Sequence, residues 1–318
     1  MRGSSSSCPP DRAGVSGPVG ARERRLVDAL HAWGAIELRD LPWRRTRDPW
    51  AVLVSEAMLQ QTQVARVVDR YGPFLNRFPT PAAMAASPLA DVLDAWAGLG
   101  YYRRARDLHR AASAMVERHG GGVPDTLEEL TALPGIGRYT ARAVLALAFE
   151  HDHGVVDTNV ARVLARAFRG EPMTAAVVQR LADALVPTGR AWAHNQTLLD
   201  LGATVCTARE PRCGVCPLVR ACAWRRAGGG DRAQEDAPAD PARTTAGTSR
   251  PQARFAGSDR EGRGRLLAAL RGAPTGVARA GLDAVTGWDD AERSGRVADG
   301  LVADGLAVWA RGRLRTPR

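Results

Sequence analysis

The sequence predicts an all-α fold over its first 225 residues, on three observations. Apolar residues recur at helical spacing in successive segments, such as residues 22–33, 127–133 and 175–185. Proline and aspartate stand where helices begin, as at Asp48-Pro49. No run in this part of the chain predicts a strand.

The chain is basic and is long enough for two compact domains. It has 318 residues and a formal net charge of +10, and all 44 of its positive side chains are arginine. A basic balance suits a polyanionic partner such as nucleic acid, although a protein can be basic without one. No apolar run approaches the roughly 20 residues that a membrane span needs, and the N-terminus lacks an apolar signal core. We therefore expect a cytoplasmic protein with no membrane segment.

The N-terminal part carries a basic aromatic turn and then an apolar helix with one acid. The stretch Leu41–Arg45 (LPWRR) predicts a rigid turn whose arginines can bond a base or a phosphate. Glu56 lies in the apolar helix that starts at Asp48-Pro49. If it is buried there, its carboxyl group retains a proton more readily, as a general acid must. The alternative is an ordinary surface glutamate at a helix boundary.

Two short segments after this helix suit contact with a duplex. The run Gln60-Gln61-Thr62-Gln63 has amide side chains that fit base edges, or it is a solvated helix end. The turn Gly98–Arg104 (GLGYYRR) has glycines that permit close backbone approach, so that Leu99 and Tyr101 can act as wedges between base steps. A helix-capping turn with buried aromatics is the alternative.

Residues 127–149 predict two helices joined by a tight turn, LPGIG, at residues 133–137. Gly135 and Gly137 allow backbone angles and close approaches that other residues do not. The N–H groups at the start of the second helix have no partner within the helix and lie at its positive end, so the turn can hold a phosphate. A simple packing corner between helices is the alternative. The loop after the second helix delivers a single carboxylate, Asp157.

Four cysteines near residue 210 are the strongest chemical signal in the chain. Their spacing, C-x6-C-x2-C-x5-C, predicts a metal site made by Cys206, Cys213, Cys216 and Cys222. A structural zinc site more often has two separated C-x2-C pairs, whereas a single tight loop suits a 4Fe–4S cube. Cys8, in the N-terminal tail, is not counted among these ligands.

The composition changes after residue 226. Residues 227–258 are of low complexity and predict a flexible linker. Beyond it, helices are expected at 259–270, 278–285 and 289–303, followed by a short hairpin. Residues 259–318 therefore predict a small winged-helix-like module with no assigned role.

The order of these features resembles the helix-hairpin-helix DNA glycosylases that carry an iron–sulfur cluster, and most of all the A/G-specific adenine glycosylases of the MutY type. The matching stretches are LPWRRTRDPWAVLVSEAMLQQTQV, GLGYYRRARDLH, LPGIGRYTA, VVDTNVARVLAR, NQTLLDLGATVCT and the cysteine loop. The resemblance implies a two-lobed glycosylase domain at residues 21–226. The Ser, Pro and Gly composition of residues 1–20 predicts a disordered tail before it. One lobe is a six-helix barrel at 46–150, and the other lobe, at 21–45 and 151–226, holds a 4Fe–4S cluster.

The resemblance also implies a role for each matching residue. Asp157 faces the sugar and stabilises an oxocarbenium-like transition state, and Asn159 fixes Asp157. Glu56 protonates the adenine and assists the attacking water. The residues that border the flipped nucleotide and the adenine pocket are Tyr139, Trp43, Arg44 and Gln196. The residues that contact the duplex are Gln60, Gln61, Thr62, Leu99, Tyr101, Gly135, Gly137 and Arg138. The four cysteines bind the cluster.

Tyr139 also bears on the type of reaction. Bifunctional relatives place a lysine at this position to form a Schiff base, and this chain contains no lysine. The resemblance therefore implies hydrolysis that leaves an abasic site, and it nearly excludes an endonuclease III-like lyase. The implied partner is double-stranded DNA with adenine opposite 8-oxoguanine or guanine, bound by a monomer.

One part of the family pattern is missing. Full-length members carry a strand-rich C-terminal domain, similar to nucleotide pyrophosphohydrolases, that reads 8-oxoguanine opposite the adenine. Here the linker and the small module stand in its place, so a preference for 8-oxoguanine would rest on Gln61, Thr62, Leu99 and Tyr101 or on the module.

Two other functions fit parts of the sequence. A mismatch thymine glycosylase of the same superfamily is disfavoured by the glutamine run, Arg44 and Gln196. A non-catalytic iron–sulfur DNA-binding protein is disfavoured because Glu56 and Asp157 are both retained.

Overall fold

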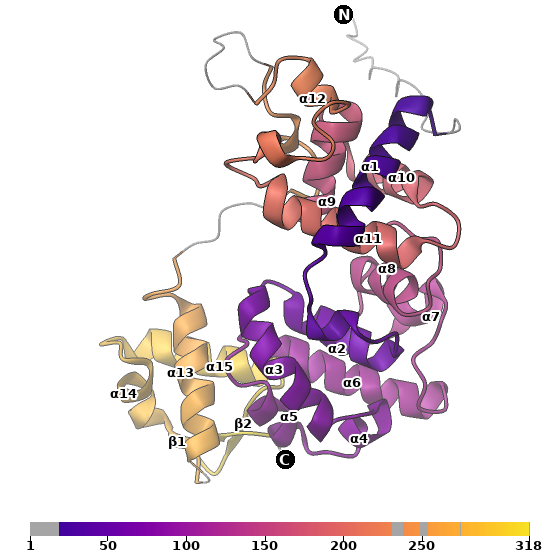
Figure 1. Ribbon diagram of the computed structural model, residues 1–318. Helices are drawn as coiled ribbons and strands as arrows, with labels where there is room; N and C mark the ends of the chain where they lie inside the picture. The colour runs from indigo at the N-terminus through magenta and orange to yellow at the C-terminus, as the bar shows by residue number, and fades with distance from the viewer. Residues whose placement is uncertain (1–18, 231–237, 249–253, 274, 318) are drawn as a thin grey trace, which may run out of the picture. The chain divides into compact units, whose positions relative to one another are not determined.

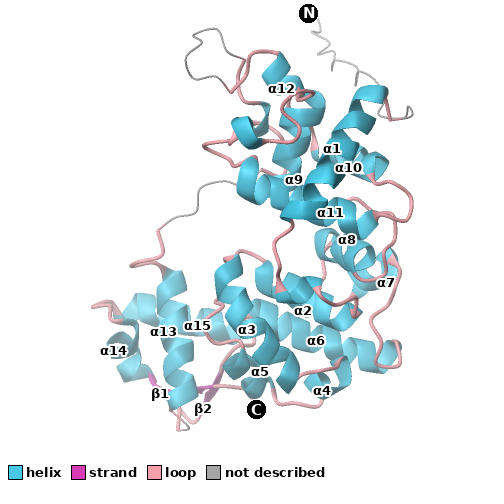
Figure 2. Cartoon of the chain, viewed as in Figure 1, coloured by secondary structure: helices cyan, strands magenta, loops and turns pink. Residues whose placement is uncertain are grey.

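The computed structural model of the chain describes residues 19–230, 238–248, 254–273 and 275–317. Within these residues helices make up nearly all of the regular structure, and the strands lie near the C-terminus (Figure 1) (Figure 2). The chain forms two compact units, Met1–Leu38 with Asp152–Thr248 and Arg39–His151 with Ser249–Arg318. The predicted, predominantly helical fold is confirmed. Of the helices described, none is both long and apolar enough to cross a membrane.

The first unit is built around the long helix α1 (Ala21–Glu37). Its buried residues Leu26, Leu30 and Gly34 recur every four positions, so one stripe of the helix faces the core. This helix packs against α11 (Ala191–Asp200). The other elements of the unit are α9 (Thr158–Val163), η2 (Leu164–Arg169), α10 (Ala175–Leu185), η3 (Leu201–Val205), η4 (Cys213–Val215), α12 (Ala223–Arg226) and η5 (Pro241–Arg243).

Two helices of the first unit end in a π-helical turn. The helix predicted for residues 160–168 is α9 followed by η2, and α11 continues as η3. η3 approaches α9 so closely that a Cβ atom at Gly202 would lie 2.6 Å from the Cβ atom of Asn159. Wide turns of this kind are frequent at functional sites. Here η3 leads directly into Cys206.

The second unit surrounds a buried helix, α2 (Pro49–Leu59). Every residue from position 50 to position 58 is buried, and Glu56 is among them. Asp48 caps the helix, because its carboxylate accepts hydrogen bonds from the N–H groups of Trp50 and Ala51. The helices that pack against α2 are α3 (Val64–Arg77), α6 (Arg103–Arg118) and α8 (Arg138–Leu147). The remaining elements before residue 152 are η1 (Pro42–Arg44), α4 (Pro81–Ala85), α5 (Leu89–Ala95) and α7 (Leu127–Ala132).

The C-terminal module belongs to the same unit and has three helices and a small sheet. Its elements are α13 (Asp259–Gly272), β1 (Val277–Ala278), η6 (Arg279–Gly281), α14 (Leu282–Thr286), α15 (Ala291–Ala303), β2 (Val308–Ala310) and β3 (Arg313–Arg315). The sheet is antiparallel in the order β1-β3-β2. The expected start of the second helix, at residue 278, was wrong. Ala278 pairs instead with Arg313 in the sheet, and the α-helix begins at Leu282.

Part of the expected linker is ordered and belongs to the first unit. Asp240 caps η5 by accepting from the N–H group of Ala242, and its carboxylate pairs with the buried Arg166 of η2. The expectation of a flexible linker therefore does not hold for residues 238–248, because side chains of this stretch have fixed partners. The expected tail with Cys8, up to residue 18, and residues 231–237 and 249–253 of the linker lie outside the described residues.

The close packing of α1 on α11 makes Gly34 sensitive to substitution. A Cβ atom at this position would lie 2.6 Å from Cγ2 of Thr197, a β-branched side chain with little freedom to move away. We expect Gly34→Ala to lower the free energy of unfolding by about 1–3 kcal/mol, measured by urea denaturation. Gly72→Ala is the control, because a Cβ atom there meets nothing within 4 Å. Equal stability of the two variants would contradict this packing.

Candidate functional site

Asp157 begins helix α9 as its N-cap residue. One carboxylate oxygen, Oδ1, accepts hydrogen bonds from the backbone N–H groups of Asn159 and Val160, at 2.8 and 2.7 Å. The other oxygen, Oδ2, accepts from Nδ2 of Asn159 at 2.8 Å. Burial raises the pKa of Asp157 above its ordinary value, and these hydrogen bonds oppose the rise by favouring the ionised form. The result is a partly desolvated carboxylate in a fixed orientation.

The loop before Asp157 is attached to α10 and α11. The N–H group of Gly154 donates to Oδ1 of Asp183 at 2.9 Å, and the N–H group of Val155 donates to Oδ1 of Asn195 at 2.8 Å. A Cβ atom at Gly154 would lie 2.5 Å from the carbonyl carbon of Ala182, so only glycine lets the loop pass this close to α10. These contacts fix the direction in which the loop enters α9.

Arg162, one turn further along the same helix, orients Asn159. Its Nη2 atom donates to Oδ1 of Asn159 at 2.8 Å, so the amide nitrogen of Asn159 is the group that faces Asp157. The same guanidinium donates to the carbonyl oxygens of Gly202 and Cys206, at 2.6 and 2.7 Å. Arg162 is not among the predicted site residues, although it follows Asn159 by three positions and so lies on the same face of a helix. Arg162 thus connects the proposed acid to the cysteine loop.

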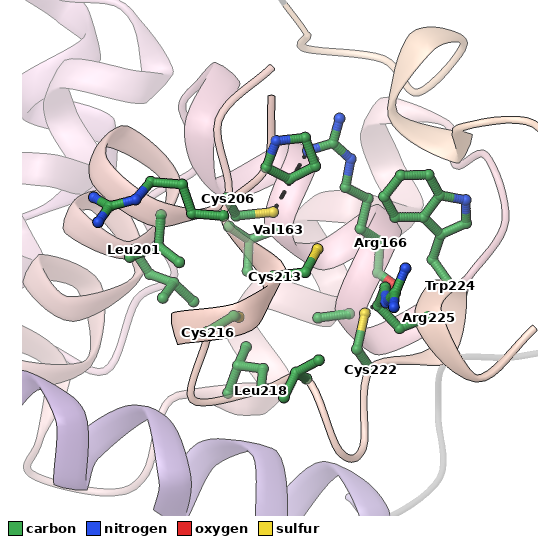
Figure 3. Close-up of a pocket in the computed structure, with 15 residues that line it drawn as sticks. Val163, Arg166, Leu201, Cys206, Cys213, Cys216, Leu218, Cys222, Trp224 and Arg225 are labelled. Carbon is green, nitrogen blue, oxygen red and sulfur yellow. Dashed lines mark hydrogen bonds between the residues drawn. The ribbon is translucent and has the colours of Figure 1, made fainter. Parts of the chain in front are cut away.

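The four cysteines line one pocket of the first unit (Figure 3). The lining contains sulfur, aliphatic and arginine side chains but no carboxylate or imidazole among the described residues. Among the described residues, no three side chains of His, Cys, Asp or Glu are grouped so that they could hold one metal ion. Burial raises the pKa of the Cys216 thiol to about 12 and also raises the pKa of Cys206 and Cys222. Sulfur-only donors in a dry pocket fit an iron–sulfur group, which would supply positive charge for the thiolates.

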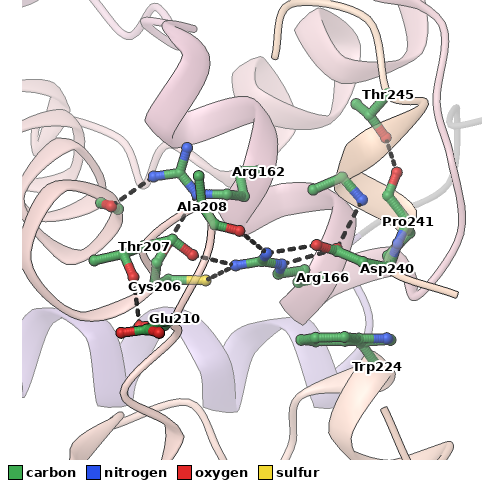
Figure 4. Close-up of polar contacts among 12 residues, drawn as sticks. Arg162, Arg166, Cys206, Thr207, Ala208, Glu210, Trp224, Asp240, Pro241 and Thr245 are labelled. Carbon is green, nitrogen blue, oxygen red and sulfur yellow. Dashed lines mark hydrogen bonds and ion pairs between the residues drawn. The ribbon is translucent and has the colours of Figure 1, made fainter. Parts of the chain in front are cut away.

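A second buried arginine supports the cysteine loop (Figure 4). Nη1 of Arg166 donates to Sγ of Cys206 at 3.6 Å and to the carbonyl oxygen of Thr207 at 2.7 Å, and Nη2 donates to the carbonyl oxygen of Ala208 at 3.0 Å. Its guanidinium binds both carboxylate oxygens of Asp240, at 2.9 and 2.6 Å. The ring of Trp224 lies 5.0 Å from it. Asp240 was not predicted, because nothing in a low-complexity sequence indicates a partner 74 positions away.

In the second unit, Glu56 is 6% exposed, so the alternative of a surface glutamate is wrong. Trp43 of η1 is also buried, and its ring meets that of Tyr71 edge to face at 5.7 Å. Nη1 of Arg44 donates to the carbonyl oxygen of Arg39 at 3.0 Å. Gln196, the remaining residue of the expected adenine pocket, is buried in α11 of the first unit.

The glutamine run and the GLGYYRR turn meet through Arg104. Its guanidinium donates to carbonyl oxygens at the end of α2 and in the turn, and to Oγ1 of Thr62 at 3.0 Å. Burial lowers the pKa of Arg104 to about 10. Gln61 and Tyr101 have left-handed backbone conformations, with φ of 57° and 47°, which non-glycine residues rarely adopt. Backbone strain of this kind is concentrated at functional sites.

The expectation for Leu99 does not match the structure. Its side chain is 2% exposed, whereas Tyr101 is 37% exposed. Gly98 and Gly100 have φ values of 88° and 69°, and these turn Leu99 toward the core. The side chain available as a wedge in this turn is therefore Tyr101.

The hairpin predicted from LPGIG joins α7 to α8. Gly135 has φ of 74°, and a Cβ atom there would lie 2.5 Å from Cβ of Asp107, so this position requires glycine for packing. Gly137 and Arg138 are exposed, and a Cβ atom at Gly137 meets nothing within 4 Å. Nε2 of Gln60 donates to Oγ1 of Thr140 at 3.1 Å, which joins the glutamine run to α8 next to Tyr139. Internal packing explains Gly135 but not Gly137.

Comparison with known proteins places these features in a family. Residues 54–188 match the model of the HhH-GPD superfamily base excision DNA repair proteins. The chain is 45% identical to the adenine DNA glycosylase of Mycobacterium tuberculosis over an aligned stretch of 307 residues. This stretch covers 92% of each protein. It is also 45% identical over 212 residues to the adenine DNA glycosylase of Homo sapiens, which covers 62% of this chain and 39% of that protein.

Two solved structures have a similar fold. A thermostable thymine-DNA glycosylase matches 64% of this chain and 97% of its own, with a TM-score of 0.60 and 28% sequence identity. An endonuclease III in a trapped covalent complex with DNA matches 63% of this chain and 93% of its own, with a TM-score of 0.54 and 26% identity.

Proposed function

The chain belongs to the HhH-GPD superfamily of base excision DNA repair proteins, as a DNA glycosylase of the adenine-specific MutY type, and from this premise we propose that it hydrolyses the N-glycosidic bond of adenine mispaired in DNA. The observation that carries the proposal is the Asp157 carboxylate, fixed by Asn159 at the start of α9 within a chain 45% identical to adenine DNA glycosylases. The mispair that we assign is adenine opposite 8-oxoguanine or guanine.

In this mechanism Asp157 acts as an anion. As the bond between base and sugar breaks, positive charge develops on the sugar, and a desolvated carboxylate stabilises it more strongly than one in water. The three hydrogen bonds to Asp157 keep it in place and ionised. Glu56, buried in α2, supplies the proton that makes adenine a leaving group, and then assists the attack of water.

The remaining residues bind and position the DNA. We assign Tyr139 to the flipped nucleotide, and Trp43, Arg44 and Gln196 to the adenine pocket. The exposed Gly137 and Arg138 at the start of α8 suit a DNA phosphate, because the glycine leaves open space beside helix N–H groups. Gln61, Thr62 and Tyr101 suit contact with the duplex.

We also propose that the reaction stops at an abasic site. Position 139 is tyrosine and the chain has no lysine, so no lysine side chain can form the Schiff base of a bifunctional glycosylase. Strand breaks should therefore appear only after the product is treated with heat and alkali.

Cys206, Cys213, Cys216 and Cys222 would hold a 4Fe–4S cluster. When bound, the cluster would cross-link the loop at residues 206–222 and offset part of the negative charge of its four thiolates. Arg162 and Arg166 bond the carbonyl oxygens at residues 206–208, so the protein orients the loop from its backbone as well as from its sulfur atoms.

The proposed function is tested by single-turnover excision on matched duplexes. They place adenine opposite 8-oxoguanine, guanine or thymine, and thymine opposite guanine, each with and without alkali. We expect breaks at adenine opposite 8-oxoguanine and guanine, and only after alkali. Cleavage at thymine opposite guanine would assign the chain to the thymine glycosylases instead, and breaks without alkali would contradict hydrolysis as the only reaction.

The hydrogen bond from Asn159 to Asp157 predicts a pH effect. Asp157 must be ionised, so excision is lost as the pH falls through its raised pKa. Asn159→Ala removes a hydrogen bond that lowers this pKa, so the acid limb of the pH–rate profile should move to higher pH. The loss of one hydrogen bond to a charged group, about 1.5–3 kcal/mol, corresponds to a rate roughly ten- to a hundredfold lower.

Asp152→Asn is the control for this profile, because it removes an exposed carboxylate of the same loop that bonds only the N–H group of Gly189 among the contacts described. An unchanged acid limb in Asn159→Ala would show that the Asn159 hydrogen bond does not tune Asp157.

The contact between Arg166 and Asp240 predicts an effect on cluster retention. Asp240→Asn leaves a buried guanidinium without its charge partner, and breaking a buried pair costs about 3–5 kcal/mol. We expect less iron per protein and faster loss of the cluster's visible absorbance in a chelator. Asp40→Asn is the matched control, because the pair of Asp40 with Arg45 is exposed and contributes little. Equal iron retention by both variants would contradict a supporting role for Asp240.

A further inference from the structure

A groove of 1130 Å³ lies in the second unit, and the proposed excision chemistry does not use most of it. One side consists of residues 60–63, Arg66 and the GLGYYRR turn. The other side consists of helix α13, Asp304 and Leu306 of the C-terminal module, together with Phe255, which precedes the module. Small-molecule sites are typically about 300–1,000 Å³ and cover most of their ligand. The size of this groove suits a segment of a polymer better.

The groove is strongly basic. Among the described residues its charged lining consists of Arg66, Arg103, Arg104, Arg260, Arg263 and Asp304. The single carboxylate, Asp304, is already paired with Arg263 and lies 3.6 Å from Arg103. The excess of guanidinium groups gives the groove the electrostatic character that a phosphate backbone requires.

Two exposed aromatic rings border the groove. Phe255 is 59% exposed and Tyr101 is 37% exposed. Arg260 lies between them: its Nη1 donates to the hydroxyl of Tyr101 at 3.0 Å, and its guanidinium lies 6.0 Å from the centre of the Phe255 ring. Aromatic faces beside arginines are how proteins bind single strands, because bases stack on the rings while phosphates meet the cations. An acidic peptide would satisfy the arginines but not the exposed rings.

Both walls of the groove are held together. Nη1 of Arg271 in α13 donates to the hydroxyl of Tyr102 at 2.8 Å, and Arg106 of α6 donates to the carbonyl oxygen of Asp304. The C-terminal module therefore contacts the GLGYYRR turn, in which Tyr101 has a strained backbone conformation.

We propose that this groove binds a strand of the substrate DNA, with one base stacked on Phe255 and phosphates bound by Arg66 and Arg260. The proposal rests on the proposed function and extends it, because it gives the C-terminal module a part in binding DNA. It also assigns Arg260 as the residue that positions Tyr101 against that strand.

Gly264 of α13 allows a sharp test. It lines the groove, and a Cβ atom there meets nothing within 4 Å. Gly264→Glu adds a carboxylate at a position where a Cβ atom has open space, and Gly264→Gln adds an uncharged side chain of the same size. We expect the glutamate variant to bind a duplex with an A·G mispair about tenfold more weakly than the glutamine variant at low salt, with the gap closing as salt rises. Gly272→Glu, outside the groove, is the control for net charge.

These affinities are measured by fluorescence anisotropy with Asp157→Asn also present, so that excision does not enter the result. Equal binding by the Gly264→Glu and Gly264→Gln variants would overturn the proposal, and so would a loss shared equally by Gly272→Glu. If the native chain fails to excise adenine, the proposed function is wrong. The affinities of the Gly264 variants still test whether the groove binds DNA, because they do not depend on excision.

Phe255→Ala tests the stacking face separately. With 5-iodouracil at successive positions of each strand, irradiation should cross-link the native chain at Phe255, mapped by mass spectrometry. The alanine variant should lose this cross-link and bind several-fold more weakly to a duplex with an unpaired base than the native chain. Val116→Ala, which shortens an exposed side chain outside the groove, should change neither. Cross-links confined to other parts of the chain would contradict the assignment.

Discussion

A single buried guanidinium, that of Arg162, fixes both the proposed catalytic carboxylate and the start of the cysteine loop. A buried cation must have its donors satisfied, so each acceptor around it has a defined place. Here the acceptors are the amide oxygen of Asn159 and the carbonyl oxygens of Thr158, Gly202 and Cys206. Because the amide oxygen is taken, the amide nitrogen binds Asp157. The cysteine loop is therefore connected to the acid through two side chains, those of Arg162 and Asn159.

Two other buried arginines also join separate segments of the chain. Arg166 joins the cysteine loop to Asp240, and Arg104 joins the end of α2 to the turn that carries Tyr101. In each case the guanidinium binds backbone carbonyl oxygens of a loop, so it helps to determine where that loop lies. A lysine could not replace it, because an ammonium group has three donors and no planar fork. The abundance of arginine is thus partly structural, beyond the attraction of a basic protein to DNA.

Local features of this protein were predictable from sequence. Asp157 is an N-cap residue followed by apolar helical spacing, the LPGIG turn needs glycine at position 135, and the cysteines cluster by spacing alone. The features that were missed depend on backbone conformation or on distant partners. Leu99 is buried because two flanking glycines turn it inward, Asp240 is ordered by Arg166, and Ala278 is a strand residue because Arg313 pairs with it. Periodicity in the chain carries no information about such contacts.

In the proposed mechanism Asp157 performs the chemistry and is not required for DNA binding. Its most direct test compares the native chain with Asp157→Asn on one duplex that has adenine opposite 8-oxoguanine. Affinity is measured by anisotropy, and excision is measured under single-turnover conditions on the same samples. We expect nearly unchanged affinity with excision reduced by at least about a thousandfold, because the amide cannot offset the charge that develops on the sugar. Excision within about tenfold of the native rate would show that Asp157 does not have this catalytic role.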